Sequence, residues 1–121
     1  MTTQMPPYTD STEVAQYIAG QRTAGSGSRT QPVYNPASGA VTRQVRLGNV
    51  QDVDAAVAAA AAAFPTWAEV PPIRRARILN SFLALLNEHR DTLAAMITAE
   101  HGKVFTDAQG EVTRGIEIVE F

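Results

Sequence analysis

The stretch Glu100–Phe121, EHGKVFTDAQGEVTRGIEIVEF, decides how the rest of the chain is interpreted. The helix before it is predicted to stop at Gly102, because a glycine readily adopts the left-handed conformation that closes a helix. A second helix is predicted to follow, with Thr106 and Gln109 at the spacing of a capping box. The apolar side of this second helix consists of residues at helical spacing, namely Ala108, Val112, Ile116 and Val119.

The apolar side of this predicted helix runs to Phe121, the last residue, with no glycine, proline or basic turn after it. Such a stripe needs another surface to pack on. The composition points the same way, since 45% of the residues are apolar but many are alanines, which bury little area each. We therefore expect the chain to be a truncated, N-terminal portion of a longer polypeptide.

Composition and charge exclude several classes of function. The formal net charge is −2, and no basic face is visible that could neutralise nucleic-acid phosphates. No apolar run approaches the roughly 20 residues of a membrane span, and no signal peptide precedes the polar start. The sequence has no cysteine, which excludes disulfides and a cysteine nucleophile within these residues. We expect a cytoplasmic protein that binds neither nucleic acid nor a membrane.

The first part of the chain predicts short strands. Residues 1–14 lack periodicity and are expected to be a loose lead-in, whereas residues 15–121 are expected to form one incomplete α/β domain. Strands are predicted at Ala15–Ile18, Gln31–Tyr34 and Val41–Leu47. The last two are expected to form a hairpin with one face covered by helix, because an isolated hairpin is marginal in water.

Two turns connect these strands. Asn35–Gly39 is a turn with a clear mechanism, since proline fixes φ and asparagine and glycine adopt the special conformations. Gly25-Ser26-Gly27 could in principle cradle a phosphate. It lacks the third glycine and the following helix N-terminus of such loops, so a hairpin loop is the favoured interpretation.

Three to four helices are predicted after the strands. Asn49 is a good N-cap and Asp52 complements the dipole of a helix from Val50 to about Phe64, which Pro65 is expected to end. Trp67 is expected to be a buried anchor in the connector that follows. The inward side of this helix is expected to consist of Val53, Val57, Ala60 and Phe64.

The second helix is predicted from Pro71 and Pro72 to about His89, and Asp91 is expected to cap a third that ends at His101. The two histidines have no second ligand at metal spacing, so structural roles are expected. Three arginines in the first turns of the second helix oppose its dipole, and ion pairing is favoured over ligand binding for Arg74, Arg75 and Arg77. The inward side of the second helix is expected to consist of Ala76, Leu79, Phe82, Leu83 and Leu86.

No nucleophile–base pair, metal-ligand pair or phosphate loop is identifiable in the sequence. The polar residues that could converge are Glu100, Lys103, Glu111, Arg114 and Glu117. For Glu111, Arg114 and Glu117, whose i, i+3, i+6 spacing places them along one side of the helix, an ion-paired and solvated side is the simpler interpretation. The sharper hypothesis concerns Arg114, which lies between two glycines, each costing roughly 1 kcal/mol in a helix interior. Such glycines indicate close approach by a backbone or ligand, and an arginine beside them suits bidentate capture of a carboxylate.

At these residues the sequence resembles the N-terminal part of the aldehyde dehydrogenase superfamily. The shared motifs are the YNPASG turn, the helical DVDAAVAAAAAAFPTWAEVPPIRRARIL stretch and an E-x-G-K element at Glu100, Gly102 and Lys103. More narrowly, the closing stretch is similar to the CoA-acylating methylmalonate-semialdehyde dehydrogenase branch. In that branch, E-[HN]-G-K and GEV-x-RG-[IL]-E-x-VEF occur together. The similarity extends over residues 15–121 here, and over about the first quarter of a family member.

The resemblance implies part of the cofactor-binding domain of an aldehyde dehydrogenase. It implies NAD-dependent, CoA-acylating oxidation of malonate or methylmalonate semialdehyde to acetyl- or propionyl-CoA, CO₂ and NADH, as in valine and inositol catabolism. In the family a cysteine thiolate attacks the aldehyde, and that cysteine and the glycine-rich NAD segment lie downstream of the residues matched here. We therefore expect the 121-residue chain alone to bind neither cofactor and to form no NADH.

One family role falls on a residue of this chain. The arginine of GEV-x-RG, Arg114, would bind the carboxylate of the semialdehyde, whereas Lys103 and Glu100 are expected to be structural. The resemblance also implies that the remainder of the enzyme, beyond Phe121, is a partner of this segment and that the complete enzyme is a homotetramer. Two alternatives stay open: another aldehyde dehydrogenase subfamily, or a non-catalytic helical interaction module.

Overall fold

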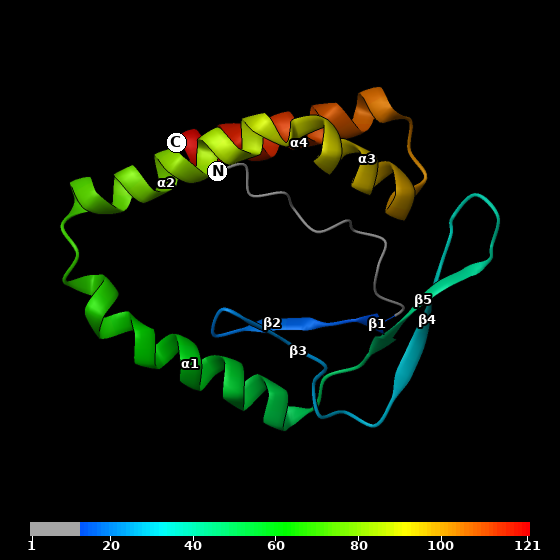
Figure 1. The fold of residues 1–121 in the computed structure, drawn as a ribbon, viewed down its shortest axis with the longest axis horizontal. Helices are drawn as coiled ribbons and strands as arrows, with labels where there is room; N and C mark the ends of the chain where they lie inside the picture. Colours follow the sequence, from blue (N-terminus) through cyan, green and yellow to red (C-terminus); the bar gives the residue numbers. More distant parts are fainter. Residues whose placement is uncertain (1–12) are drawn as a thin grey trace. The chain divides into compact units, whose positions relative to one another are not determined.

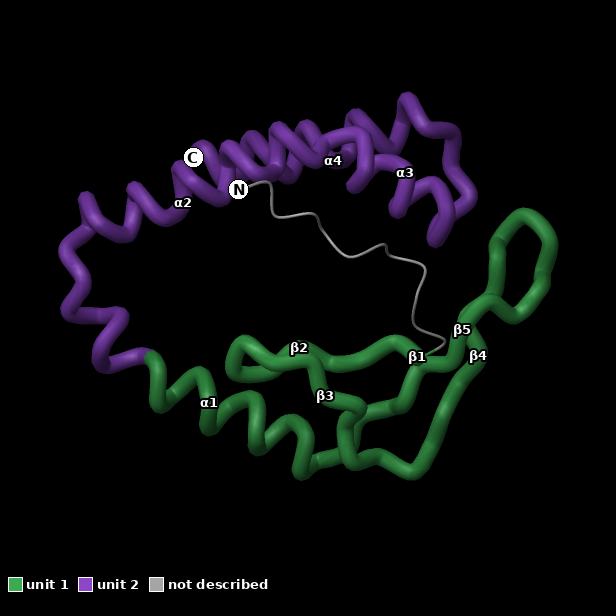
Figure 2. The backbone as a smooth tube through the Cα atoms, viewed as in Figure 1, with its two compact units in different colours: residues 1–63 green, residues 64–121 purple. Residues whose placement is uncertain are grey.

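The structure is a computed structural model that describes residues 13–121. Of the predicted lead-in, residues 1–12 lie outside the described residues, and the last two form strand β1 (Glu13–Val14), which pairs in parallel with a later strand. Short strands followed by four helices make up the described chain, which confirms the predicted α/β class (Figure 1). The chain divides into two compact units, Met1–Ala63 and Phe64–Phe121 (Figure 2).

The first sheet of the first unit is a two-stranded hairpin. Strand β2 (Gln16–Ile18) pairs antiparallel with β3 (Gln21–Thr23), and Ala19 and Gly20 make the turn with positive φ values of 52° and 76°. The strand predicted at 15–18 is thus confirmed within one residue. Its partner β3 falls where the sequence predicted only loop, because a polar three-residue strand lacks the apolar alternation that marks a strand.

The second sheet contains the predicted hairpin. Strand β4 (Thr30–Tyr34) pairs antiparallel with β5 (Val41–Arg46), and β1 lies on the other side of β5. The turn forms as the sequence predicts, because Asn35 Oδ1 accepts hydrogen bonds from the backbone N–H groups of residues 37 and 38 at 2.8 and 3.2 Å. Gly39 completes it with a φ of 71°.

Helix α1 (Val50–Ala68) begins as predicted and ends later. Pro65 lies inside the helix, near its C-terminal end. A proline there costs only one backbone hydrogen bond, and its own carbonyl still accepts from the N–H of Glu69 at 3.3 Å. Trp67 therefore belongs to the last turn of α1, where it is 41% exposed rather than buried in a connector. The side predicted to face inward is not buried, since its large members Val53, Val57 and Phe64 are exposed.

The second unit is built from helices α2 (Pro72–Glu88), α3 (Arg90–His101) and α4 (Phe105–Glu120). Helix α3 packs on α4, and α2 also contacts α4. The buried core consists of Ala94, Ala108, Val112 and Ile116, with half-buried Leu83, Leu86, Leu93 and Ile97 around it. The apolar side predicted for α4 is thus confirmed as the centre of this unit.

The cap predictions for α3 and α4 were partly wrong. Gly102 closes α3 with a φ of 84° as predicted, but Val104 is the N-cap of α4 and makes no side-chain cap. Because α4 starts at Phe105, Thr106 already lies within its first turn and cannot cap it. Asp91 likewise lies one residue inside α3, and its Oδ1 instead accepts a hydrogen bond from Gln109 Nε2 at 2.7 Å.

Helix α2 buries little of its predicted inward side. Leu83 and Leu86 are half-buried against the core, whereas Leu79 and Phe82 are 49% and 46% exposed and Ala76 is exposed. The prediction therefore holds only for the end of α2 near α4. Within residues 13–121, the search for a helix long and apolar enough to traverse a lipid bilayer finds none.

Candidate functional site

The predicted polar residues lie around the junction between α3 and α4. Gly102 reverses the chain, and Lys103 follows it with a side chain that is only 18% exposed. Lys103 Nζ donates to Oε1 of Glu111, which lies in the second turn of α4. The junction therefore holds one lysine against the side of α4.

The environment of Glu111 favours its charged form. The hydrogen bond from Lys103 is the largest cause that lowers the pKa of Glu111 below its ordinary value. The positive charges of Lys103, Arg114 and His101 lower this pKa further, and partial loss of hydration opposes them. Glu111 is consequently an anion at neutral pH, bound mainly by the lysine.

Arg114 lies in the next turn of α4 and is much more open. Its Nη2 is 3.9 Å from Oε1 of Glu111, which is beyond hydrogen-bonding distance although within the range of an ion pair. The side chain is 69% exposed. No hydrogen bond joins its guanidinium to another residue of the described part of the chain. Arg114 therefore presents unused donors on the surface of α4.

The two glycines beside Arg114 leave space around it. A Cβ added at Gly115 would meet nothing within 4 Å, and one at Gly110 would meet only Arg114 Nη1 at 3.9 Å. The close approach that the glycines predicted is therefore not made by any described residue. Both positions are compatible with a ligand that reaches the helix backbone near the guanidinium.

The remaining two predicted site residues lie outside this cluster. Glu100 is exposed in the last turn of α3, and Glu117 is exposed on α4 beyond Arg114. The structure thus brings Lys103, Glu111 and Arg114 together. The pairing of Lys103 with Glu111 was not predicted, because the two are eight residues apart and lie on different elements. The signal that could have revealed it is Gly102, which ends α3 and sends the chain back along α4.

Other charged residues in the second unit form no site. None of the arginines at the start of α2 makes an ion pair within residues 13–121, so the acidic neighbours predicted for Arg74, Arg75 and Arg77 are not found. His89 lies between α2 and α3, where it is the cap residue of both helices, and His101 is exposed at the end of α3. In the described part of the chain, no three metal-binding side chains come together.

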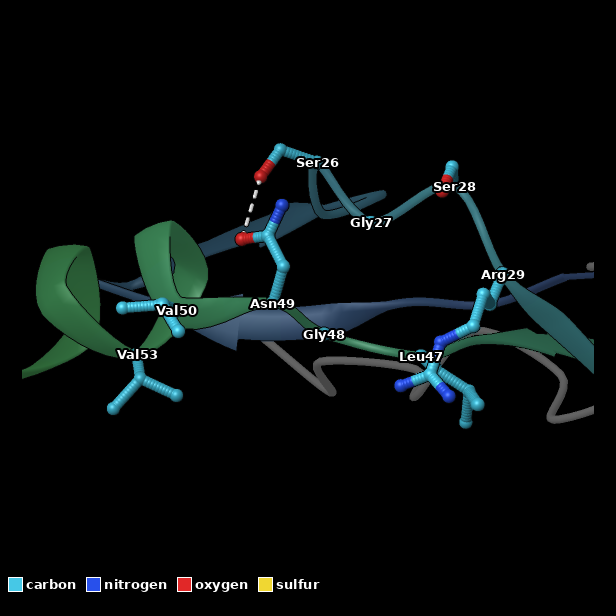
Figure 3. A pocket seen from close by; sticks show the side chains of 9 residues that line it. All are labelled: Ser26, Gly27, Ser28, Arg29, Leu47, Gly48, Asn49, Val50 and Val53. Atoms are coloured by element: carbon cyan, nitrogen blue, oxygen red, sulfur yellow. Dashed lines mark hydrogen bonds between the residues drawn. The ribbon is translucent and has the colours of Figure 1, made fainter.

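The first unit contains a pocket of about 640 Å³ at the start of α1 (Figure 3). It is lined by residues 26–29 of the glycine–serine loop, by residues 47–49 after β5, and by the first turn of α1. Ser26 points at Asn49 across the loop, and its Oγ lies 3.1 Å from Asn49 Oδ1 (Figure 3). Gly27 is buried, and a Cβ there would lie 1.9 Å from the carbonyl oxygen of Leu47. This loop is therefore fixed against the α1 start.

The carboxylate of Asp52 accepts hydrogen bonds from the glycine–serine loop and from the start of α1. Asp52 Oδ1 accepts hydrogen bonds from the Ser26 backbone N–H at 2.8 Å and from its hydroxyl at 2.9 Å. Asp52 Oδ2 accepts from the N–H of Asn49 at 3.0 Å, and Asn49 Oδ1 accepts from the N–H of Asp52 at 3.0 Å. The backbone hydrogen bond from Asn49 is the largest cause that lowers the pKa of Asp52. These reciprocal hydrogen bonds confirm Asn49 as the N-cap. The contact with Asp52 accounts for the position of the glycine–serine loop without a bound phosphate.

Sequence comparison assigns most of the chain to one family. The profile of the aldehyde dehydrogenase family matches residues 23–121. Malonate-semialdehyde dehydrogenase 1 of Geobacillus kaustophilus is 48% identical over 112 residues, which are 93% of this chain and 23% of that protein. The malonate-semialdehyde dehydrogenase of Bacillus pumilus is 48% identical over 113 residues, with the same coverage of both chains.

Structure comparison agrees. A Sinorhizobium meliloti protein designated a methylmalonate-semialdehyde dehydrogenase, in complex with NAD, matches with a TM-score of 0.87 and 44% sequence identity. The match covers 90% of this chain and 22% of that one. The chain thus spans less than a quarter of the length of the curated relatives that it matches.

Proposed function

The chain belongs to the aldehyde dehydrogenase family, and on this premise we propose that it is part of a malonate- or methylmalonate-semialdehyde dehydrogenase. We propose further that the complete enzyme uses NAD, transfers the acyl product to CoA and assembles as a homotetramer. The 48% identity to two proteins named as malonate-semialdehyde dehydrogenases supports this subfamily over others. The role proposed for this segment is to recognise the acidic end of the substrate.

Arg114 is the residue proposed for that recognition. The observation that carries the proposal is its guanidinium, which is 69% exposed and makes no hydrogen bond to any other described residue. A guanidinium offers several donors in a fixed plane and can bind both oxygens of one carboxylate. The open backbone at Gly115 allows a small ligand to come close to the helix.

Recognition at the carboxylate also orients the reacting carbon. In malonate semialdehyde a single methylene group separates the carboxylate from the aldehyde carbon. Binding the carboxylate in a bidentate geometry therefore restricts the aldehyde carbon to a small region of space. Fixing a reacting group in this way lowers the entropy cost of reaching the transition state. An uncharged aldehyde of equal length would lack this restraint.

The described residues supply neither the nucleophile of the family nor an open phosphate-binding loop. The sequence contains no cysteine, so the thiolate nucleophile of the family must come from outside these 121 residues. The loop that most resembles a phosphate cradle gives the Ser26 N–H to Asp52. No step of the reaction is therefore assigned here to a contact with NAD or CoA.

The proposal is tested by the substitution Arg114→Leu in a complete enzyme that carries this segment. We expect kcat/KM for malonate semialdehyde to fall by about 10- to 150-fold, which corresponds to the ~1.5–3 kcal/mol of hydrogen bonds to a charged group. We expect kcat/KM for propanal, an uncharged aldehyde of the same chain length, to change by less than about threefold. Arg74→Leu removes another arginine of this unit and should leave both values unchanged. Equal losses for both substrates would contradict the carboxylate role.

An interaction module is the second candidate function, and one observation favours it. Helix α2 exposes several large apolar side chains, namely Ile73, Ile78, Leu79, Phe82 and Leu85. Such a surface promotes association with another protein. A segment that packs against the remainder of an enzyme would show the same surface. The two differ in thermal unfolding of the purified chain, since an independent module should melt sharply at a defined oligomeric state and a segment of an enzyme should not.

A further inference from the structure

Arg114 has a potential competitor for its guanidinium on its own helix. Glu111 precedes it by three residues, which is a spacing at which acidic and basic side chains pair on a helix surface. A guanidinium paired in this way would offer fewer donors and less positive charge to a substrate carboxylate. An arginine proposed to select acidic substrates therefore requires that this local pair be weak.

The structure contains the residue that weakens it. Lys103 Nζ donates to Oε1 of Glu111, the same oxygen that lies 3.9 Å from Arg114 Nη2. Lys103 is the least exposed of the three side chains at 18%, against 39% for Glu111 and 69% for Arg114. The lysine reaches Glu111 from the α3–α4 junction, so its position depends on the fold rather than on α4 alone. Glu111 is consequently hydrogen-bonded to Lys103 and not to Arg114.

We propose that Lys103 is a positioning residue for substrate selection, which binds Glu111 and so keeps the Arg114 guanidinium free for a carboxylate. This inference rests on the proposed function, because it assumes that Arg114 binds the acidic end of the substrate. It assigns to the lysine of the E-x-G-K element a role beyond holding the turn. It also makes Glu111 a residue whose charge becomes harmful when the lysine is removed.

The charges of the cluster lead to the same expectation. Two cations and one anion give the cluster a net charge of +1, which one bound carboxylate neutralises. Without Lys103 the net charge is zero, and Glu111 can swing to Arg114. Removing both Lys103 and Glu111 restores the net charge of +1 and leaves no local competitor. The double variant should therefore recover what the single lysine variant loses.

The test uses Lys103→Met, Glu111→Gln and the double variant in a complete enzyme. For Lys103→Met we expect the KM for malonate semialdehyde to rise about two- to fivefold, the range of an exposed ion pair. The KM and kcat for propanal should not change. Adding Glu111→Gln should return the KM for malonate semialdehyde to within about twofold of the wild-type value. Lys103→Arg, which keeps a cation, should behave like the wild type.

Inhibition by malonate gives a second readout that does not depend on turnover of the semialdehyde. Its inhibition constant for propanal oxidation should rise with Lys103→Met and recover in the double variant, in parallel with the KM. If Lys103→Met yields no folded enzyme, Lys103→Gln, which removes the charge but keeps a donor to Glu111, should show the same effect at smaller size.

The outcomes separate this inference from the proposed function. Equal losses on both aldehydes, not recovered by Glu111→Gln, would show that Lys103 only supports the fold and would overturn the inference. Arg114→Leu is measured alongside. If it impairs both substrates equally, the carboxylate role of Arg114 itself is wrong. If Arg114→Leu impairs only malonate semialdehyde, but the double variant does not recover the KM for that substrate, only the role of Lys103 is wrong.

Discussion

Asp52 in the first unit and Glu111 in the second both have a lowered pKa, but for different reasons. The carboxylate of Asp52 accepts hydrogen bonds with both of its oxygens, from Ser26 and from the N–H of Asn49, at the start of α1. Glu111 is bound through one oxygen by a lysine, and an arginine without hydrogen bonds lies next to it. The first carboxylate completes a helix cap, whereas the second belongs to a group of charges with one cation to spare.

This difference suggests which polar residues of a fold are available for a ligand. Around Asp52 both carboxylate oxygens accept hydrogen bonds from donors within the same unit, so this group contributes to stability. Around Glu111 the lysine satisfies the anion and the neighbouring guanidinium keeps its donors. Holding a cation close to an anion without a hydrogen bond gains little stability, since exposed ion pairs contribute about 0–1 kcal/mol. The open guanidinium of Arg114 is what the proposed carboxylate role requires.

The largest expected effect comes from a pair of glycine substitutions that contrasts the two regions. Gly27→Ala places a Cβ 1.9 Å from a backbone carbonyl oxygen, so the backbone must shift, and we expect a loss of about 1–3 kcal/mol or more. Gly115→Ala meets nothing within 4 Å and should gain up to about 1 kcal/mol of helix propensity. Urea unfolding followed by circular dichroism measures both. A tolerated Gly27→Ala would show that the loop is not fixed against the start of α1.

The sequence predicted well those features that depend on neighbouring residues. The Asn35 turn, the Asn49 cap and the Gly102 stop each arise from a side chain or glycine acting within about four residues, and each was found. The apolar side of α4 was also predicted from its helical spacing, and three of its four predicted members are buried in the core of the second unit. Local chemistry and helical periodicity are sufficient for such features.

Features that depend on distant residues were missed or wrong. The Lys103–Glu111 pair and the hydrogen bonds between Ser26 and Asp52 join elements whose contact no local pattern reveals. The capping box expected at Thr106 failed because Gln109 has a better partner on α3 and the helix starts one residue earlier than Thr106. For α1 and most of α2, the sides that periodicity predicted to face inward are exposed.

A smaller effect is expected from two cap substitutions that test the confirmed and the rejected N-cap. Asn49→Ala removes the side chain that accepts from the N–H of Asp52, and losing such a cap costs about 0.5–2 kcal/mol. Thr106→Ala should leave stability unchanged or slightly raised, because Thr106 lies inside α4 and alanine has the higher helix propensity. Hydrogen exchange of the first-turn amides measures each helix separately. Faster exchange at the start of α4 in Thr106→Ala would show that Thr106 does cap this helix.

The smallest effect concerns pH and separates the two carboxylates directly. For each, the pKa is lower in the folded chain than its ordinary value of about 3.9 for aspartate or about 4.3 for glutamate. The stabilisation is therefore fully present above these values and is lost as the pH falls through the lower folded values. Because backbone hydrogen bonds are the larger cause for Asp52 and a lysine for Glu111, salt should affect them differently. Raising the salt concentration should return the pKa of Glu111 toward its ordinary value more than that of Asp52, as followed by NMR titration of the carboxyl carbons. Equal salt responses would mean that the two carboxylates are held in the same way, and the contrast between a completed cap and an open charge cluster would fail.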